Sequence, residues 1–346
     1  GSQIPPSSPI NTCVGISGPI VDINSALDPA IDVVITGHTH LPYNCLLAGP
    51  DGNLRMVTSA FSFGRVVSEF NLVLDKRTKD VRRDLSTAVN HPVIQSQVTP
   101  DPVITQIINK WRVLADPIGR RQGGPITGDS KRAFIGSTEE RASESNAGNM
   151  IADAQLFATQ ANDAQIAFMN PGGIRSDLIY AKSGSESVDG IVTYAEAFTF
   201  QPFSNILMTF PMTGAQIIGV LEDQCQPAGV SRPFLHLGVS AGFTYDLAKT
   251  FGPVDHDNNP NTNPVNSCTS ISVTNVKLNG VDLDPNATYV VTANQFIADG
   301  GDNFTTFREV DSTLRIGGGI DLDPLIEYMA QAPVSPPGTN RVNELP

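Results

Sequence analysis

The chain has 346 residues, of which 40% are hydrophobic and 16% charged, a composition typical of a folded protein with more than one folded unit. Its 22 basic and 35 acidic side chains give a net charge of −13, which disfavours binding to nucleic-acid polymers and anionic membranes. No run of 18 or more apolar residues occurs, so we expect no membrane span. A small anionic ligand remains possible wherever a few arginines converge.

Four cysteines, Cys13, Cys45, Cys225 and Cys268, bear on the compartment. No C-x-x-C spacing occurs, so neither a cysteine zinc site nor a thioredoxin-type redox pair is expected. The even number favours an oxidising location: secreted, periplasmic or at the cell surface. We prefer the pairs Cys13–Cys45 and Cys225–Cys268, each of which closes a loop within one domain. Four buried thiols are the alternative.

Residues 1–88 predict strands joined by turns. The apolar run at 31–35 predicts a buried strand that ends before Gly37. Segments 53–59 and 65–74 predict a following hairpin or meander. No complete α/β unit precedes these strands, so the fragment alone would expose sheet edges and an apolar face. We therefore expect further elements to complete it.

Residues 89–118 predict a linker that contains a helix. Pro102 lies in the first turn, which is a favourable place for proline, and Asp116-Pro117 is expected to end the helix. A partly helical apolar stripe runs along it, made of Val103, Ile107, Ile108, Trp111, Val113 and Leu114.

Residues 119–346 predict one α/β domain. Helices are expected from Asn146, as the cap, to about Gln160, from Thr213 to Asp223, and from Asp323-Pro324 onward. Short apolar runs predict the strands, at 165–169, 206–210, 240–245, 271–278 and 289–293.

His38 and His40 directly follow the strand predicted at 31–35. Their spacing of two residues is expected to turn both imidazoles to the same side, and Gly37 lets the backbone approach a ligand. Neutral imidazole is a common ligand of zinc, manganese and similar ions. A bare His-x-His is also compatible with two surface-loop histidines.

The segment Asn170 to Arg175 places an amide and a guanidinium around Gly172 and Gly173, after a predicted strand. Glycines permit close approach of a ligand, and arginine offers a planar fork to phosphate or carboxylate. Arg141, just before a predicted helix, is a second candidate. Each arginine alone is also compatible with a surface ion pair, but together they indicate a phosphate clamp.

Phe203 and Phe296 lie among polar residues in predicted loops, where two rings can sandwich a nucleobase. Their alternative role is core packing. Asp302 follows the Gly300-Gly301 turn and could accept hydrogen bonds from ribose hydroxyls, although turn-forming aspartates are common.

These motifs, in this order, resemble the 5'-nucleotidase family of metallophosphatases, clearly from 37 to 45 and most strongly from 141 to 328. The resemblance implies an α/β domain with a mixed α+β sheet at 119–346, the 5'-nucleotidase C-terminal domain that binds substrate. A linker helix at 89–118 would precede it. Residues 1–88 would be a β-rich remnant of the four-layer metallophosphoesterase sandwich.

The resemblance also assigns roles. Arg141 and Arg175 would contact phosphate or carboxyl-like oxygens, and Asp302 would hold the ribose. Phe203 and Phe296 would stack on the base. Asn170 and Asn205 would flank the nucleoside of a small-molecule nucleotide partner. The base, the number of phosphates and the oligomeric state stay open.

In the intact parent, two divalent ions (zinc, manganese or similar) would activate water to release a nucleoside and phosphate, with His38 and His40 among their ligands. The family's other ligand blocks, Asp-x-His, Gly-Asp and Gly-Asn-His-Asp/Glu, do not occur upstream of His38. We therefore expect this chain to hold no metal or only part of the centre, and to bind without turnover. A non-catalytic nucleotide-binding module and a secreted surface scaffold are the alternatives.

Overall fold

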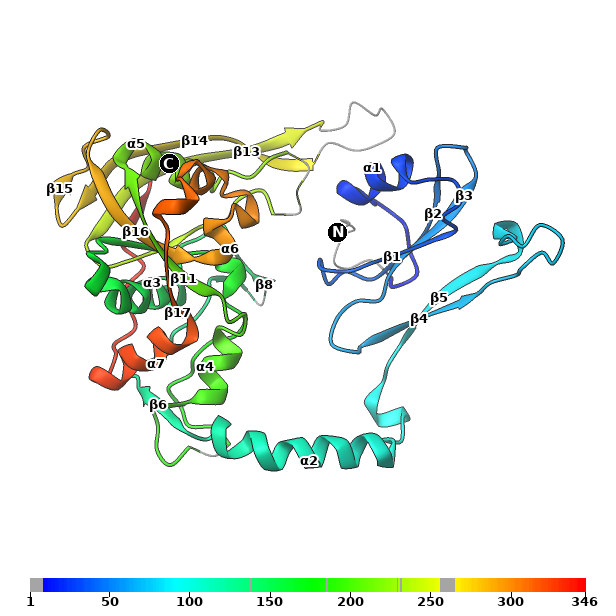
Figure 1. Cartoon of the computed structure of the whole chain (residues 1–346), viewed down its shortest axis with the longest axis horizontal. Coiled ribbons are helices and arrows are strands. Elements are labelled where there is room, and N and C mark those ends of the chain that lie inside the picture. The colour runs from blue at the N-terminus through cyan, green and yellow to red at the C-terminus, as the bar shows by residue number, and fades with distance from the viewer. Residues whose placement is uncertain (1–8, 137, 185, 229, 231, 256–264) are drawn as a thin grey trace. The chain divides into compact units, whose positions relative to one another are not determined.

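The computed structural model describes residues 9–346 except 137, 185, 229, 231 and 256–264 (Figure 1). Two compact units can be distinguished. One runs to Thr105 and takes in parts of 228–231 and 253–265, and the other contains the remaining residues from Gln106 onward. None of the helices in the described ranges combines the length and apolarity needed to cross a bilayer.

The first unit contains a three-stranded sheet and a separate hairpin. In the sheet, β3 is central, β1 is parallel to it and β2 antiparallel, while β4 and β5 pair with each other. The expected pairing of segment 53–59 with 65–74 is therefore wrong, because β1 and β2 already occupy both edges of β3. The elements are α1 Pro19–Ala26, β1 Val33–Thr36, β2 Tyr43–Ala48, β3 Leu54–Ser59, β4 Val66–Asn71 and β5 Thr87–Pro92.

Helix α1 was not predicted, although a proline in its first turn and Asp22 are start signals. Its Ile20 packs with Tyr43, Cys45 and Val57 in a small core. On β1, by contrast, Ile35 is 70% exposed. The expectation of a buried strand at 31–35 is therefore right about the strand and wrong about its burial.

Helix α2 (Pro102–Gly119) begins as predicted: Asp101 Oδ1 accepts from the backbone N–H groups of Val103 (2.7 Å) and Ile104 (3.0 Å). It does not end at Asp116, because Pro117 is accommodated in the last turn. There a missing N–H removes only one intrahelical bond. The predicted apolar stripe is exposed along its whole length.

The second unit is built on a five-stranded mixed sheet, as predicted. Strands β9 and β16 are parallel neighbours, and the remaining pairs are antiparallel. The strand order is β12 (Gly238–Val239), β9 (Ile166–Met169), β16 (Thr288–Asn294), β11 (Ile206–Thr213) and β17 (Ile316–Ile320).

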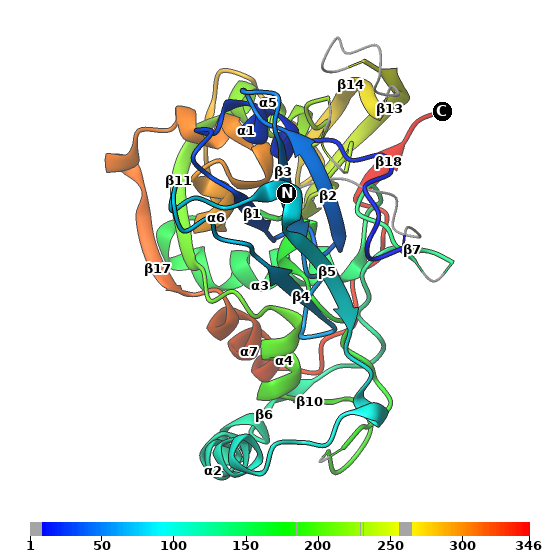
Figure 2. The same cartoon turned by 90° about the vertical axis from the view of Figure 1, so that its right-hand side faces the viewer.

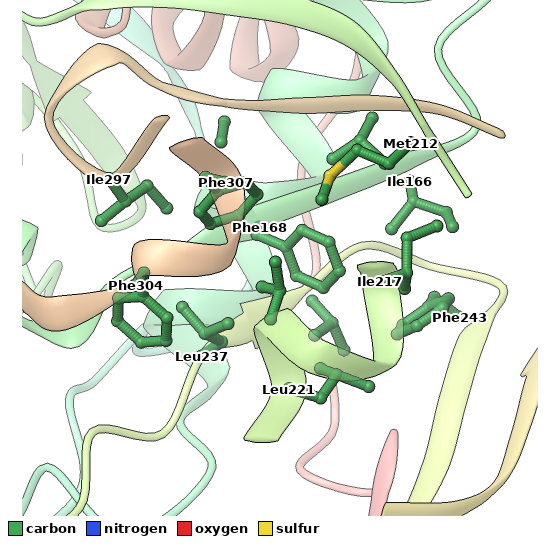
Figure 3. Packing of buried hydrophobic residues seen from close by; sticks show 14 of the residues in the cluster. Ile166, Phe168, Met212, Ile217, Leu221, Leu237, Phe243, Ile297, Phe304 and Phe307 are labelled. Carbon is green, nitrogen blue, oxygen red and sulfur yellow. The ribbon is translucent and has the colours of Figure 1, made fainter. Parts of the chain in front are cut away.

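Alternation along β9 distributes two hydrophobic cores over the two faces of this sheet. Ile166 and Phe168 belong to one core, and Ala167 and Met169 to the other. The first core includes residues of α5 and α6 and is shown in Figure 3, where Phe168 lies near Phe243 and Phe307. The second is formed with α3, α4 and α7, which lie together in both views (Figures 1 and 2). These helices are α3 Asn146–Thr159, α4 Tyr194–Phe200, α5 Gly214–Glu222, α6 Gln295–Ala298 and α7 Leu322–Gln331.

A second, four-stranded sheet packs its buried side chains into the first of these cores. Both expected disulfides are present, Cys13–Cys45 and Cys225–Cys268, so the alternative of four buried thiols is wrong. The strands are β15 Val281–Asp282, β14 Val265–Leu278, β13 Phe243–Val254 and β18 Val342–Glu344, and two small pairs are formed by β6 Gln122–Pro125 with β10 Ile191–Thr193 and by β7 Phe134–Ile135 with β8 Thr138–Glu139.

The helix caps differ in one place from expectation. Ser145, not Asn146, caps α3: its Oγ accepts from the Gly148 N–H at 3.0 Å, while Asn146 Oδ1 accepts from the Lys131 N–H. Helix α4 was missed, although Thr193 and Glu196 form a capping box that the sequence displays.

Candidate functional site

Three loops singled out in the sequence share one edge of the five-stranded sheet. Because β9 and β16 are parallel, Asn170, which follows β9, and Asn294, the last residue of β16, lie at the same edge. Strand β11 runs the other way and pairs Leu207 with Asn294, so Phe203 to Asn205, just before β11, begin at this edge as well. Carboxyl ends of parallel strands are a common place for ligand sites in α/β proteins.

A chain of side-chain hydrogen bonds connects two of these loops. Asn294 Nδ2 donates to Asn170 Oδ1 at 3.0 Å, and Asn170 Nδ2 donates to Asp302 Oδ2 at 2.8 Å. Asn294 also caps α6, because its Oδ1 accepts from the Ile297 N–H. Asp302 has a left-handed backbone (φ 53°), which turns its carboxylate back toward Asn170. The capping residue of α6 is therefore connected to Asp302 through Asn170.

Gly172 is the point at which three predicted groups meet. A Cβ at this position would lie 3.0 Å from Asp302 Oδ2 and 3.3 Å from both Arg141 Nη1 and Asn170 Nδ2. A side chain would therefore crowd the amide, the carboxylate and the guanidinium. At Gly173 a Cβ would instead meet the Met169 side chain, so this glycine serves packing.

The two predicted arginines lie close enough to influence each other. Arg141 Nε donates to Glu139 Oε1 at 2.5 Å, and Arg175 Nη1 donates to the Gly172 carbonyl at 3.4 Å. Burial, followed by the positive charge of Arg141, lowers the pKa of Arg175. The site thus concentrates positive charge in an acidic protein.

The two predicted stacking rings are exposed, at 54% for Phe203 and 44% for Phe296, so the core-packing alternative is wrong. The Arg175 guanidinium lies 5.7 Å from the Phe203 ring centroid. Phe296 covers Gly301, where a Cβ would come within 2.7 Å of ring carbons. Phe203 therefore lies close to Arg175, and Phe296 contacts Gly301, the residue before Asp302.

The side chain of Asn205 is engaged elsewhere. Its Nδ2 donates to Asp321 Oδ2 at 3.2 Å, and its carbonyl accepts from the Asp321 N–H at 2.8 Å. Burial raises the pKa of Asp321 to about 6. The contacts place Asn205 as an anchor of the loop that carries Phe203.

Sequence reasoning missed Glu139, which pairs with Arg141, and it missed Arg132 and Arg232, which pair with Glu139. Glu139 could have been noticed as a carboxylate two residues before a candidate arginine. Arg132 and Arg232 are distant in the chain, and no pattern in the sequence connects them to the site.

His38 and His40 lie in the first unit, in the loop between β1 and β2. Both have left-handed backbones (φ 75° and 55°), and the His40 ring packs edge-on against Phe63. Within the described ranges, no group of three or more His, Cys, Asp or Glu side chains is placed to hold a metal ion. Two imidazoles do not make a two-metal centre, so these residues do not fit one, and no catalytic step follows from them.

The sequence profile of the 5'-nucleotidase C-terminal domain matches residues 122–309. Cell wall protein Lmo0130 of Listeria monocytogenes is 30% identical, over 88% of this chain and 36% of its own length. Endonuclease YhcR of Bacillus subtilis is 26% identical, over 82% of this chain and 19% of its own. The chain thus spans about a third of the length of the first relative and about a fifth of the length of the second.

Among solved structures, a 5'-nucleotidase precursor from Thermus thermophilus shares the fold. Its TM-score is 0.57 at 24% identity, over 91% of this chain and 59% of that one. More than half of the sequence matches the family profile, and the mixed sheet agrees with the structural neighbour. The chain therefore belongs to the 5'-nucleotidase family.

Proposed function

We propose that the second unit binds a nucleotide or nucleoside, and that the chain is part of a nucleotide phosphohydrolase that releases a nucleoside and phosphate. The convergence of an amide, a carboxylate and a guanidinium at Gly172, next to two exposed aromatic rings, supports the binding step. Membership of the 5'-nucleotidase family supports the reaction class.

The contacts suggest a role for each group. Phe203 and Phe296 would stack on the base, which contributes roughly 1–3 kcal/mol per ring contact. Asp302, held by Asn170, would accept hydrogen bonds from ribose hydroxyls. Arg141 and Arg175 would bind phosphate through their planar forks. Asn205 would act on the nucleoside through the position of the Phe203 loop.

We further propose that this chain binds without turnover. A complete centre would need two divalent ions held by several carboxylates and imidazoles, and the described residues contain no group of three or more His, Cys, Asp or Glu side chains placed to hold a metal ion. An extracytoplasmic location, secreted, periplasmic or at the surface, is supported by the two disulfides.

Titration calorimetry with adenosine and with AMP tests the binding step. We expect Phe203→Ala and Phe296→Ala each to weaken adenosine binding about five- to 150-fold, the range set by about 1–3 kcal/mol of stacking. Phe198→Ala is the matched control, because Phe198 is also 44% exposed but lies on α4. It should leave the affinity unchanged.

Unchanged affinity in both stacking variants, or no adenosine binding by the wild type, would contradict the binding proposal and favour a surface scaffold. A phosphate-release assay with AMP and manganese or zinc tests the second proposal. Turnover by this chain would show that its metal centre is more complete than we propose.

A further inference from the structure

Glu139 lies at the centre of an arginine cluster. Its Oε1 is 2.5 Å from Arg141 Nε and 3.5 Å from Arg232 Nη1, and its Oε2 is 3.0 Å from Arg132 Nη1. Burial acts to raise the pKa of Glu139, but the three arginines, Arg141 most strongly, hold it below its usual value. Glu139 is therefore an anion that is bound by the protein's own guanidinium groups.

The arginines of this cluster are not equivalent. Arg132 has a second carboxylate partner, Asp177, whose Oδ1 accepts from Arg132 Nε at 2.9 Å and from the Arg132 N–H at 3.0 Å. The two hydrogen bonds hold Arg132 and Asp177 together, and their opposite charges offset each other. Within the described ranges, Arg175 forms no ion pair, and Arg232 pairs only with Glu139, at the longest distance of the three. With Arg132 set aside, Arg141 and Arg232 share the carboxylate of Glu139, and Arg175 adds a third positive charge nearby.

The remaining charge sets what the cluster can hold. With Arg132 and Asp177 neutralising each other, Arg141, Arg175 and Arg232 against Glu139 leave two positive charges in a chain of net charge −13. The nearby carboxylate of Asp302 is not counted among the phosphate-binding groups, because the proposed function assigns it to the ribose. Burial and then the positive charge of Arg141 lower the pKa values of both Arg175 and Arg232, as expected where like charges lie near one another. A ligand with about two negative charges would relieve this repulsion.

Arg141 connects this cluster to the candidate site. Its Nε binds Glu139, while its Nη1 faces the space beside Gly172 where Asn170 and Asp302 converge. An anion bound beside Gly172 would therefore use an arginine that Glu139 already holds.

We propose that Glu139 is a resident competitor for these arginines, which lowers the affinity for anions in general and favours ligands with a dianionic phosphate group. A phosphomonoester carries about −1.5 to −2 charges at pH 7 and has three acceptor oxygens, whereas a singly charged group would leave one positive charge uncompensated. The inference rests on the proposed function, because it assumes that the phosphate of a nucleotide binds at Arg141 and Arg175.

Glu139→Gln tests this directly. Glutamine has nearly the same size and retains a carbonyl oxygen that can accept from Arg141, so the arginine stays oriented while the competing charge is lost. By calorimetry we expect AMP and inorganic phosphate to bind about tenfold more tightly than to the wild type, which corresponds to about 1.4 kcal/mol. Adenosine, which has no charge, should bind within about twofold of the wild type.

Glu140→Gln is the matched control. It changes the net charge by the same amount, but Glu140 Oε1 accepts from the Ala142 N–H, and Glu140 forms no ion pair within the part of the chain that the structure describes. This variant should bind AMP and phosphate as the wild type does. Equal tightening in both variants would mean that only the overall charge matters, and would overturn the inference.

A second variant covers the case in which Glu139→Gln is poorly folded. Arg232→Gln removes one of the three positive charges ascribed to Arg141, Arg175 and Arg232, and we expect it to weaken AMP and phosphate binding about tenfold without affecting adenosine. Unchanged or weaker AMP binding by folded Glu139→Gln, or unchanged AMP binding by Arg232→Gln, would overturn the inference.

The adenosine arm separates this inference from the proposed function. If no variant binds adenosine but phosphate binds more tightly to Glu139→Gln, the nucleotide site is wrong and the competitor role stands. If adenosine binds normally and Glu139→Gln does not change the affinity for phosphate, the nucleotide site stands and the competitor role is wrong.

Discussion

The contact between Gly301 and Phe296 allows a local test of base stacking. A methyl group on Gly301 would lie 2.5 Å from the Phe296 carbonyl oxygen and 2.7 Å from ring atoms Cε1 and Cε2. Turning the ring cannot relieve the contact with the backbone carbonyl. In Gly301→Ala the turn and the ring must therefore both shift.

Two effects of Gly301→Ala follow. Crowding of this kind costs about 1–3 kcal/mol, so the free energy of unfolding in urea should fall by about that amount. If the ring no longer stacks, adenosine affinity should fall about five- to 150-fold, as for loss of one stacking contact. Gly319→Ala is the control, because a Cβ there meets no heavy atom within 4 Å.

A double-mutant cycle assigns the loss of affinity to the ring. In a Phe296→Ala background, Gly301→Ala should weaken adenosine binding no further, since the ring has already gone. Wild-type adenosine affinity in Gly301→Ala, together with the expected loss of stability, would refute a stacking role for Phe296.

Two further predictions concern stability. Burial raises the pKa of Asp321 to about 6, above the reference value of 3.8. The folded state therefore binds this proton more tightly than the unfolded state. As pH rises from about 4 to above 6, the free energy of unfolding should fall by up to about 3 kcal/mol. The stability of Asp321→Asn relative to the wild type, measured as the free energy of unfolding in urea, should therefore be about 1–2 kcal/mol more favourable at pH 7.5 than at pH 5. A relative stability that does not change with pH would contradict this. Replacing both Cys225 and Cys268 by serine opens a cross-link with a sequence separation of 43 residues and should cost about 4 kcal/mol by the loop-entropy relation, measured by the same assay; equal stability of the oxidised wild type and the variant would count against it.

Local sequence signals predicted helix starts correctly where the interaction that begins the helix joins residues only a few positions apart. Thr213 caps α5 because a side-chain oxygen satisfies an N–H three residues later, and that spacing is visible in the sequence. The same spacing at Thr193 and Glu196 marks the start of α4, so this helix was predictable from its capping box. The sequence does not show which residues of β9 face which core, because all four are buried and both faces of the strand are covered.

The sequence by itself determined the loops that carry the candidate site. Glycine pairs mark Gly172 and the turn after Phe296, and a proline with polar neighbours marks Phe203, because turn chemistry acts over a few residues. Only the tertiary structure decided that Arg232 and Glu139 share one cluster and that Asp321 holds Asn205. Those contacts join residues about 90 or more positions apart. Asn205 meets Asp321 because β11 pairs with β17, and Arg232 comes near Glu139 where the His236 N–H donates to the Arg141 carbonyl. No local pattern encodes either arrangement.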